Sequence, residues 1–216
     1  MPIPRKVRAD GERTREAIVR EAVSLATLDG LDGLSIGNLA DALAMSKSGV
    51  YAHFGSKQEL QLATLDEAGK IFMAEVIAPA LVASPGLTQL LTLCDAFFDH
   101  LLRRTLPGGC FWCGVVVEMG TRPGPVKDEI AAFQGGFAEL LRQLITTAIE
   151  QGELPDDEDP EALAFEINGL MFAANATFVL RDDPATLDLA RRIVRRRLGI
   201  SGKAAKATKS RKQRVS

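Results

Sequence analysis

Apolar residues recur along most of this chain at spacings of three and four positions, the pattern of helices with one buried face. The alternation typical of strands is missing, and the run Val115–Val117 is too short and lies in a helical context. Breaks rich in Pro, Gly and Asp separate the helical segments. The pattern predicts an all-α protein of about nine helices, at roughly 11–28, 36–43, 47–53, 57–77, 84–104, 109–119, 125–152, 160–180 and 184–200.

Three helix starts crowd into the stretch 34–60. Ser35, Ser46 and Ser56 each precede a helical segment, where a serine side chain can accept a hydrogen bond from a backbone N–H of the first turn. Glu59 follows Ser56 by three residues and completes a capping box. Two short helices joined by a tight turn, followed by the capped start of a longer helix, are typical of a helix-turn-helix unit.

The second short helix has an inner and an outer side. Lys47, Ser48, Tyr51 and His53 fall on the outer side, where a cation and hydroxyls near a helix N-terminus can reach base edges and phosphates. This arrangement indicates DNA binding. The positions expected to face the small core are Leu39, Ala40, Leu43, Val50 and Phe54.

A longer motif runs through the same stretch. Tyr51, His53, Phe54, Lys57 and Leu60 resemble the Y-x-H-F-x-x-K-x-x-L signature of the TetR (tetracycline-repressor) family of bacterial transcription regulators, and the resemblance covers about residues 12 to 72. It implies a ligand-responsive homodimeric repressor that binds double-stranded DNA at a palindromic operator and is released by a small, apolar effector. The residues expected to contact DNA are Ser35, Ser46, Lys47, Ser48, Tyr51, His53 and Lys57.

The resemblance also divides the chain. We expect a flexible N-terminal arm at 1–11, the three-helix DNA-binding domain at 12–72 with its connecting helix continuing to about 78, and an effector-binding and dimerisation domain at 79–200. Residues 201–216 are rich in Lys, Ser and Ala and predict a basic disordered tail.

The helix expected at 160–180 is apolar almost all round, so both of its sides must be covered. In proteins similar to this one, the last two helices pair with their two-fold copies. Small residues on one stripe of the helix would allow the close approach of such a copy. The predicted dimer interface comprises Phe165, Gly169, Phe172, Ala173 and Ala176 on this helix and Leu187, Ala190, Ile193 and Val194 on the last.

The effector pocket is less sharply marked. The family implies a site within the second core, but most large side chains there are expected simply to pack. Asn168 and Asn175 need hydrogen-bond partners if buried, which a ligand, the dimer partner or the backbone could provide. The residues expected to surround the effector are Phe97, Leu101, Trp112, Val116, Met119, Phe137, Met171, Asn175 and Phe178.

Composition is that of a soluble globular protein, with 46% hydrophobic and 25% charged residues. The basic start lacks an apolar signal segment, and the longest uncharged stretch, 167–180, is too short to span a bilayer, so we expect a cytoplasmic bacterial protein without membrane contact. From Arg191 onward there are eleven basic residues and no acid, and because the whole chain carries −2, the remainder carries −13. The tail either attracts phosphates non-specifically or only keeps the protein soluble.

Three cysteines, Cys94, Cys110 and Cys113, are too few for a disulfide framework. Cys110-x-x-Cys113 lacks a second ligand pair for a metal, so it is either part of the core or a redox-sensing pair. No combination of nucleophile and base, phosphate loop or acid pair supports an enzyme, and no cofactor is expected. Two alternatives to the ligand-responsive repressor are a thiol redox-sensing regulator and a non-specific architectural DNA binder that uses the tail.

Overall fold

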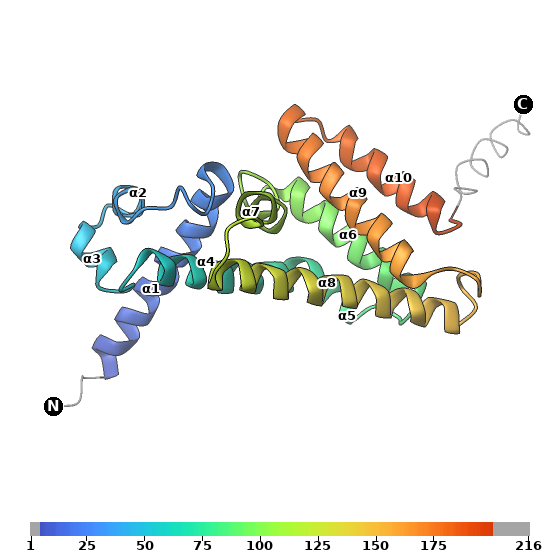
Figure 1. Ribbon diagram of the computed structural model, residues 1–216, viewed down its shortest axis with the longest axis horizontal. Helices are drawn as coiled ribbons and strands as arrows, with labels where there is room; N and C mark the ends of the chain where they lie inside the picture. Colours follow the sequence, from blue (N-terminus) through green and yellow to red (C-terminus); the bar gives the residue numbers. More distant parts are fainter. Residues whose placement is uncertain (1–4, 201–216) are drawn as a thin grey trace, which may run out of the picture.

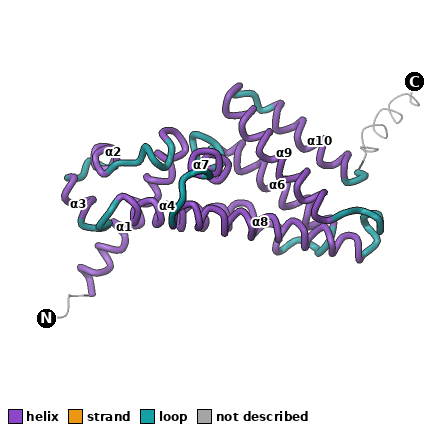
Figure 2. Tube along the Cα trace, in the orientation of Figure 1, coloured by secondary structure: helices purple, strands orange, loops and turns teal. Residues whose placement is uncertain are grey.

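The computed structural model describes the backbone of residues 5–200 and the side chains from residue 11 onward. Every regular element in this range is a helix, which confirms the all-α prediction (Figure 2). Because α4, η1 and α5 follow one another without a break, they form one continuous helix, which we call the rod. Counted in this way, the described chain has nine separate helices. The elements are α1 (Arg5–Asp29), α2 (Ile36–Ala42), α3 (Lys47–Tyr51), α4 (Lys57–Phe72), η1 (Met73–Ile77), α5 (Ala78–Leu81), α6 (Leu87–Arg103), α7 (Phe111–Met119), α8 (Pro125–Glu150), α9 (Pro160–Arg181) and α10 (Ala185–Arg197).

The helices form two groups joined by the rod (Figure 1). The short helices α2 and α3 lie with α1 at one end of the molecule, and α6, α8, α9 and α10 lie at the other. The rod packs against α1 at its beginning and against α8 and α6 further along. We call the first group the reading domain and the second, together with α7, which packs against α8, the sensor domain. The rod belongs to both, so a displacement of either can reach the other through it.

The first helix begins earlier than the sequence indicated. It starts at Arg5 rather than near Gly11, which corrects the expected flexible arm at 1–11: residues 5–10 continue the helix, and residues 1–4 lie outside the described range. The segment from Arg5 to Asp10 is made largely of good helix formers and contains no proline, so nothing in it stops the helix. At the other end Gly30, with φ +81°, terminates α1 in a left-handed turn.

The three serine caps of the reading domain are confirmed. Ser35 Oγ accepts a hydrogen bond from Asn38 N, Ser46 Oγ from Gly49 N and Ser56 Oγ from Glu59 N, each at 3.1 Å. Val50 and Phe54 are at most 1% exposed in the small core below α3. The fold therefore presents the first turn of α3 outward on a rigid base.

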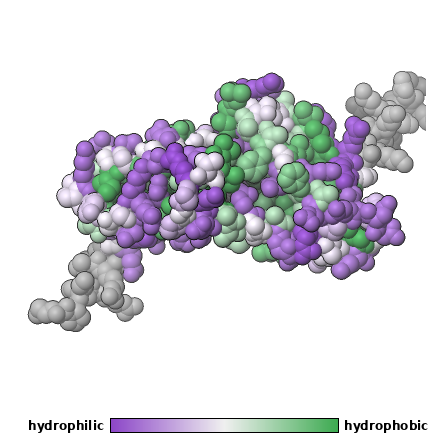
Figure 3. Space-filling view, in the orientation of Figure 1, coloured by the Kyte–Doolittle hydropathy of each residue, from purple (hydrophilic) through white to green (hydrophobic). Residues whose placement is uncertain are grey.

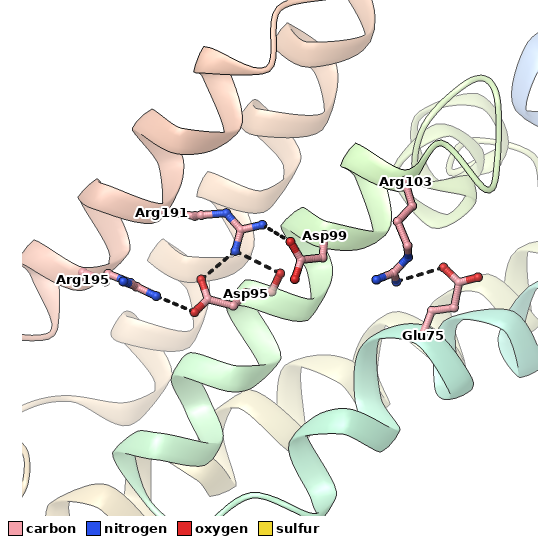
Figure 4. Close-up of polar contacts among 6 residues, drawn as sticks. All are labelled: Glu75, Asp95, Asp99, Arg103, Arg191 and Arg195. Atoms are coloured by element: carbon pink, nitrogen blue, oxygen red, sulfur yellow. Dashed lines mark hydrogen bonds and ion pairs between the residues drawn. The ribbon is translucent and has the colours of Figure 1, made fainter.

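The rod contains one irregular turn. Its five residues Met73–Ile77 adopt a π-helical conformation, a rare form that is frequent at functional sites. Glu75, in the middle of this turn, has Oε2 2.6 Å from Nδ1 of the buried His100 and 3.3 Å from an Arg103 nitrogen, and it accepts a hydrogen bond from Thr105 Oγ1 at 3.2 Å. Figure 4 shows Arg103 reaching across to Glu75. These contacts anchor the rod to α6 and the segment that follows it.

One helix of the described residues, α9, is long and apolar enough to cross a membrane by length and composition. It packs against α8 and α10, and Leu163, Ile167 and Phe178 on its inner side are at most 2% exposed. A core helix of a soluble protein passes the same test, so α9 is only a weak indication of a membrane span.

Candidate nucleic-acid interface and sensor core

The N-termini of α2 and α3 lie side by side on the outer surface of the reading domain. Ser46, Lys47 and Ser48 are exposed, and the hydroxyls of Ser46 and Ser48 are 3.2 Å apart. A methyl group at Gly37 would lie 3.6 Å from both Lys47 Nζ and Ser35 Oγ, so these two polar groups flank the same glycine. One ammonium, three hydroxyls and two helix N-termini thus face solvent together, a set of donors suited to phosphates and base edges.

Tyr51 and His53 follow at the end of α3. The Tyr51 hydroxyl donates to the carbonyl of Gly55 at 3.1 Å, while the residue as a whole is 56% exposed. This hydrogen bond braces the turn into α4 and leaves much of the ring facing solvent. His53 is half-buried, with its ring 6.4 Å from that of Phe54. Both residues lie where α3 ends and the turn into α4 begins, and their contact with DNA stays a prediction.

Lys57 has a partner that the sequence did not reveal. Its ammonium donates to the Asp32 carbonyl at 2.5 Å and to the Asp32 carboxylate at 2.9 Å. Arg122, just beyond α7, holds the other carboxylate oxygen at 2.5 Å. The Arg122 guanidinium and then Lys57 lower the pKa of this exposed carboxyl to about 2. A DNA phosphate approaching Lys57 would compete with Asp32 for the ammonium.

Glu118 fastens the same loop to the sensor domain. From α7, its two carboxylate oxygens accept the backbone N–H groups of Leu31 and Asp32, each at 2.8 Å. On the other side of this contact, Gly108 N donates to Thr27 Oγ1 at 3.0 Å. No motif pointed to Glu118 or Arg122, because their partners lie about ninety residues earlier in the chain. Together these bonds join α7 to the loop that leads into the helix-turn-helix.

The residues expected around an effector belong largely to the packed core. Of the predicted set, all but Val116 are buried, and Trp112 stacks face to face on Phe133 with ring centroids 3.5 Å apart. Phe72 of the rod meets Phe133 and Phe137 edge-on, each at 5.4 Å. The sensor core is therefore an aromatic cluster in which the rod takes part.

Two of the predicted effector residues also border hollows. Trp112 lines one of about 330 Å³ between the rod and α8, with Gly69, Lys70 and Glu129. Its indole Nε1 is buried and is the one such side-chain atom without a hydrogen-bond partner among the described residues. Asn175 borders a second hollow, and its Oδ1 accepts from Cys110 N at 2.8 Å, so a backbone group satisfies this buried amide.

A third hollow, larger than these two, lies between α1 and the rod. It holds about 640 Å³, and its lining combines apolar side chains with charged ones, among them Arg20, Glu67 and Glu75. Arg20 Nε bonds to Glu67 at 3.2 Å, so the charges are partly paired with one another. The sequence did not predict this opening, which lies at the joint between the two domains.

The outer face of α9 is an apolar surface. Figure 3 shows hydrophobic residues over α9 and α10, where Phe165 and Leu180 are 81% and 84% exposed. A hollow of about 410 Å³ separates the two helices and is lined mainly by apolar side chains. We call this surface the α9–α10 face. The residues of the predicted α9 stripe that are exposed or half-buried on it are Phe165, Gly169, Phe172, Ala173 and Ala176.

The predicted contribution of α10 to a dimer interface needs correction. Leu187, Ala190 and Val194 are 1–3% exposed because they pack inside the chain, so they are not available to a partner. The fourth predicted residue, Ile193, is 43% exposed, and Leu189, which was not predicted, is 49% exposed. The last helix therefore has two apolar stripes: three of the four predicted residues cover the chain's own core, and Ile193 lies on the exposed stripe.

Ion pairs fix α10 in that orientation. Arg191 bonds to Asp95 at 2.8 Å and to Asp99 at 2.6 Å, and Arg195 bonds to Asp95 at 2.6 Å (Figure 4). Arg197 similarly pairs with Glu158. These arginines open the basic run that begins at Arg191, and they neutralise acids of the sensor domain. The basic tail at 201–216 lies outside the described residues.

Comparison with known proteins identifies the family. The family model described as "Bacterial regulatory proteins, tetR family" matches residues 18–64. A second family model, described as "Tetracyclin repressor-like, C-terminal domain", matches residues 86–194, which by itself is just over half of the chain. The chain belongs to the TetR family. Its members are DNA-binding transcription regulators, so the helix-turn-helix assignment and the resemblance found in the sequence are confirmed.

Individual relatives agree with this assignment. Transcriptional regulator AcuR of Cereibacter sphaeroides is 24% identical over 179 residues, covering 81% of each protein. A TetR transcriptional regulator of Chloroflexus aurantiacus superposes with a TM-score of 0.82 at 25% identity, covering 88% of this chain and 96% of that one. The fold is also similar to that of AibR, solved with isovaleryl coenzyme A and operator DNA, at TM-score 0.69 and 21% identity over 84% of this chain and 97% of AibR.

Proposed function

We propose that this TetR-family protein is a cytoplasmic bacterial repressor that binds a palindromic operator as a homodimer and is released by a small effector. The observation that carries the proposal is the outward-facing first turn of α3. There Lys47 and Ser48 are exposed to solvent on a family helix-turn-helix, in the position from which a helix enters the major groove.

The two lysines of the interface should have different roles. Lys47 lies in the first turn of α3, where it can donate to a guanine edge. Lys57 begins α4 and already neutralises Asp32, so we assign it to the DNA backbone and to the loop beneath it. We therefore assign recognition of the base sequence to α3 and orientation of the protein on the DNA to the start of α4.

A homodimer is supported by the α9–α10 face. It presents a large apolar surface without a covering element in the described chain, and large exposed apolar patches mark contact surfaces. A two-fold copy would bury both faces and set the distance between two reading domains, matching a palindrome.

An effector is supported by the sensor core. The aromatic cluster joins α7 and α8 to the rod, and the unpartnered indole N–H of Trp112 could donate to an acceptor on a mainly apolar ligand. Binding that moves α7 would act on the reading domain through Glu118, which holds Leu31 and Asp32. A ligand favouring one arrangement would thereby change DNA affinity.

The proposal is tested by selecting bound duplexes from a random pool and titrating variants against the selected site and a scrambled duplex at several salt concentrations. Lys47→Ala should cost about 1–3 kcal/mol on the selected site and relax preference at one base pair per half-site. Lys57→Ala should weaken both duplexes about equally and reduce the salt slope by roughly one unit for each phosphate that the protein no longer neutralises.

Gln58→Ala is the matched control, since Gln58 is an exposed neighbour of Lys57 and carries no charge. A pool that yields no palindromic site would refute the repressor model. A Lys47→Ala variant with unchanged base preference would move Lys47 to the backbone-contacting class and leave Ser48 and Tyr51 as the readers.

A further inference from the structure

The first turn of α7 carries two thiols that the proposed function does not use. Cys110 is the N-cap of the helix and Cys113 is its third residue. They are 2% and 7% exposed, and neither forms a disulfide. As the N-cap and the third residue of the same helix, the two cysteines lie within one turn of each other, the spacing at which the side chains of a capping pair meet. A Cys-x-x-Cys pair at a helix N-terminus is an arrangement in which one thiol ionises readily.

The two thiols differ in acidity. The hydrogen bond with Cys113 lowers the pKa of Cys110 although burial opposes this effect, whereas the same contact and burial raise the pKa of Cys113 well above its usual value. Cys94 on α6 is a useful contrast, because burial and then Asp95 raise its pKa to about 12. The thiolate is the reactive form, so Cys110 is the nucleophile of the three.

A hollow of about 420 Å³ gives small molecules a route to Cys110. One wall is the end of α1, residues 26–30, and the other contains Gly108, Phe111 and Gly114. The reactive thiol thus lies where the reading domain meets the sensor domain.

We propose that Cys110 and Cys113 are an oxidation site at which a peroxide converts the two thiols to an intrachain disulfide, and that this bond changes how α7 holds the reading domain. The Cys110 thiolate attacks one peroxide oxygen, the O–O bond breaks, and the departing hydroxide takes a proton to become water, leaving a sulfenic acid. The Cys113 sulfur then attacks that sulfur. The S–S bond forms, the S–O bond breaks, and the leaving hydroxide takes the Cys113 proton as a second water. The two sulfurs together lose the two electrons that the peroxide gains.

The bond constrains the first turn of α7. Cys110 is the N-cap and has an extended backbone (φ −67°, ψ 118°), and a disulfide would hold its Cβ atom about 3.5–4.5 Å from that of Cys113. A hydrogen bond ties the start of this turn to α9, because Cys110 N donates to Asn175 Oδ1 at 2.8 Å. Glu118 sits on the same nine-residue helix and grips Leu31 and Asp32. Closing a disulfide at the first turn therefore acts on the same helix whose Glu118 holds the backbone of Leu31 and Asp32.

The experiment treats the reduced full-length protein with hydrogen peroxide and measures two properties of the protein itself. Mass spectrometry of the peptides should show a Cys110–Cys113 disulfide, the loss of two hydrogen atoms. Amide hydrogen exchange at Leu31 and Asp32 should accelerate by about tenfold or more as their bonds to Glu118 loosen. Dithiothreitol should reverse both changes. Cys94→Ser is the matched control and should behave as wild type, while Cys110→Ser, which keeps a good N-cap residue, and Cys113→Ser should show neither change.

Peroxide treatment that leaves both thiols free, or that drives Cys110 to sulfinic acid without a disulfide, would overturn the oxidation site. A disulfide that forms without changing exchange at Leu31 and Asp32 would overturn the coupling. Operator affinity is a further measurement that rests on the proposed function, with an expected change of about 5- to 150-fold on oxidation. A reduced protein that binds no DNA would refute that function, whereas the mass and exchange measurements decide the thiol proposal independently.

Discussion

Replacing Phe165 by alanine should weaken the proposed dimer without weakening the folded chain. Phe165 is 81% exposed on the α9–α10 face, so removing its ring takes little packing away from the protomer. Burying a Phe side chain is worth about 1.5–3 kcal/mol. In a two-fold dimer each protomer buries the exposed part of its Phe165 ring once. Removing both rings should therefore cost about 2–5 kcal/mol of association free energy per dimer, which raises the dissociation constant roughly 30- to 3,000-fold.

Sedimentation velocity over a range of protein concentrations measures that constant, and circular dichroism during heating follows the stability of the chain. Val82→Ala is the matched control, because Val82 is 89% exposed at the end of α5, away from the α9–α10 face. A companion variant, Gly169→Trp, adds a bulky group at a position where a Cβ atom would have no neighbour within 4 Å, so it should fold and yet remain monomeric.

Two results would refute the reasoning. The first is a wild-type protein that is monomeric at micromolar concentration. The second is a Phe165→Ala variant whose dissociation constant matches that of Val82→Ala.

Other contacts lead to three further predictions. The Asp32 carboxyl should titrate near pH 2 in carbon NMR, so its bonds to Arg122 and Lys57 should persist above pH 4 and disappear as the pH falls through about 2. Arg122→Ala should return the titration midpoint toward 3.8, and a wild-type midpoint already at 3.8 would contradict the ion pairs. An apolar effector should quench the fluorescence of Trp112, raise the melting temperature and lower operator affinity together, whereas ligands that stabilise the protein without changing DNA binding would disprove the coupling. Glu118→Gln should speed amide exchange at Leu31 and Asp32 while the neighbouring Val117→Ala, whose side chain is 78% exposed, should not; equal exchange in the two variants would show that the carboxylate is dispensable.

The reading domain was predictable because its signals are local. A serine cap and the apolar spacing that follows it involve residues within one or two turns, so Ser35, Ser46 and Ser56 marked the helix starts correctly. The family signature falls in the same stretch. The early start of α1 was not predictable in this way because Gly11 resembles a boundary, although the neighbouring helix formers carry the helix through it.

The sensor domain was less predictable because its contacts join distant parts of the chain. The spacing of Leu187, Ala190 and Val194 defines a buried stripe, but spacing does not tell whether the covering surface belongs to the same chain or to a copy. Likewise, nothing near Glu118 in the sequence indicates that it binds the backbone of residues 31 and 32. Long-range polar contacts of this kind leave no periodic trace.

The π-helical turn in the rod bears on how chain length can vary. A π turn closes a hydrogen bond over one residue more than an α turn does. Deleting one residue from Met73–Ile77 would let the rod close as continuous α-helix, with the surfaces on either side kept in their present relation. The same deletion inside α4 or α8 would rotate everything beyond it by about 100°. This turn is therefore the place where evolution can remove a residue without turning the reading domain against the sensor, at the expense of the contact between Glu75 and His100.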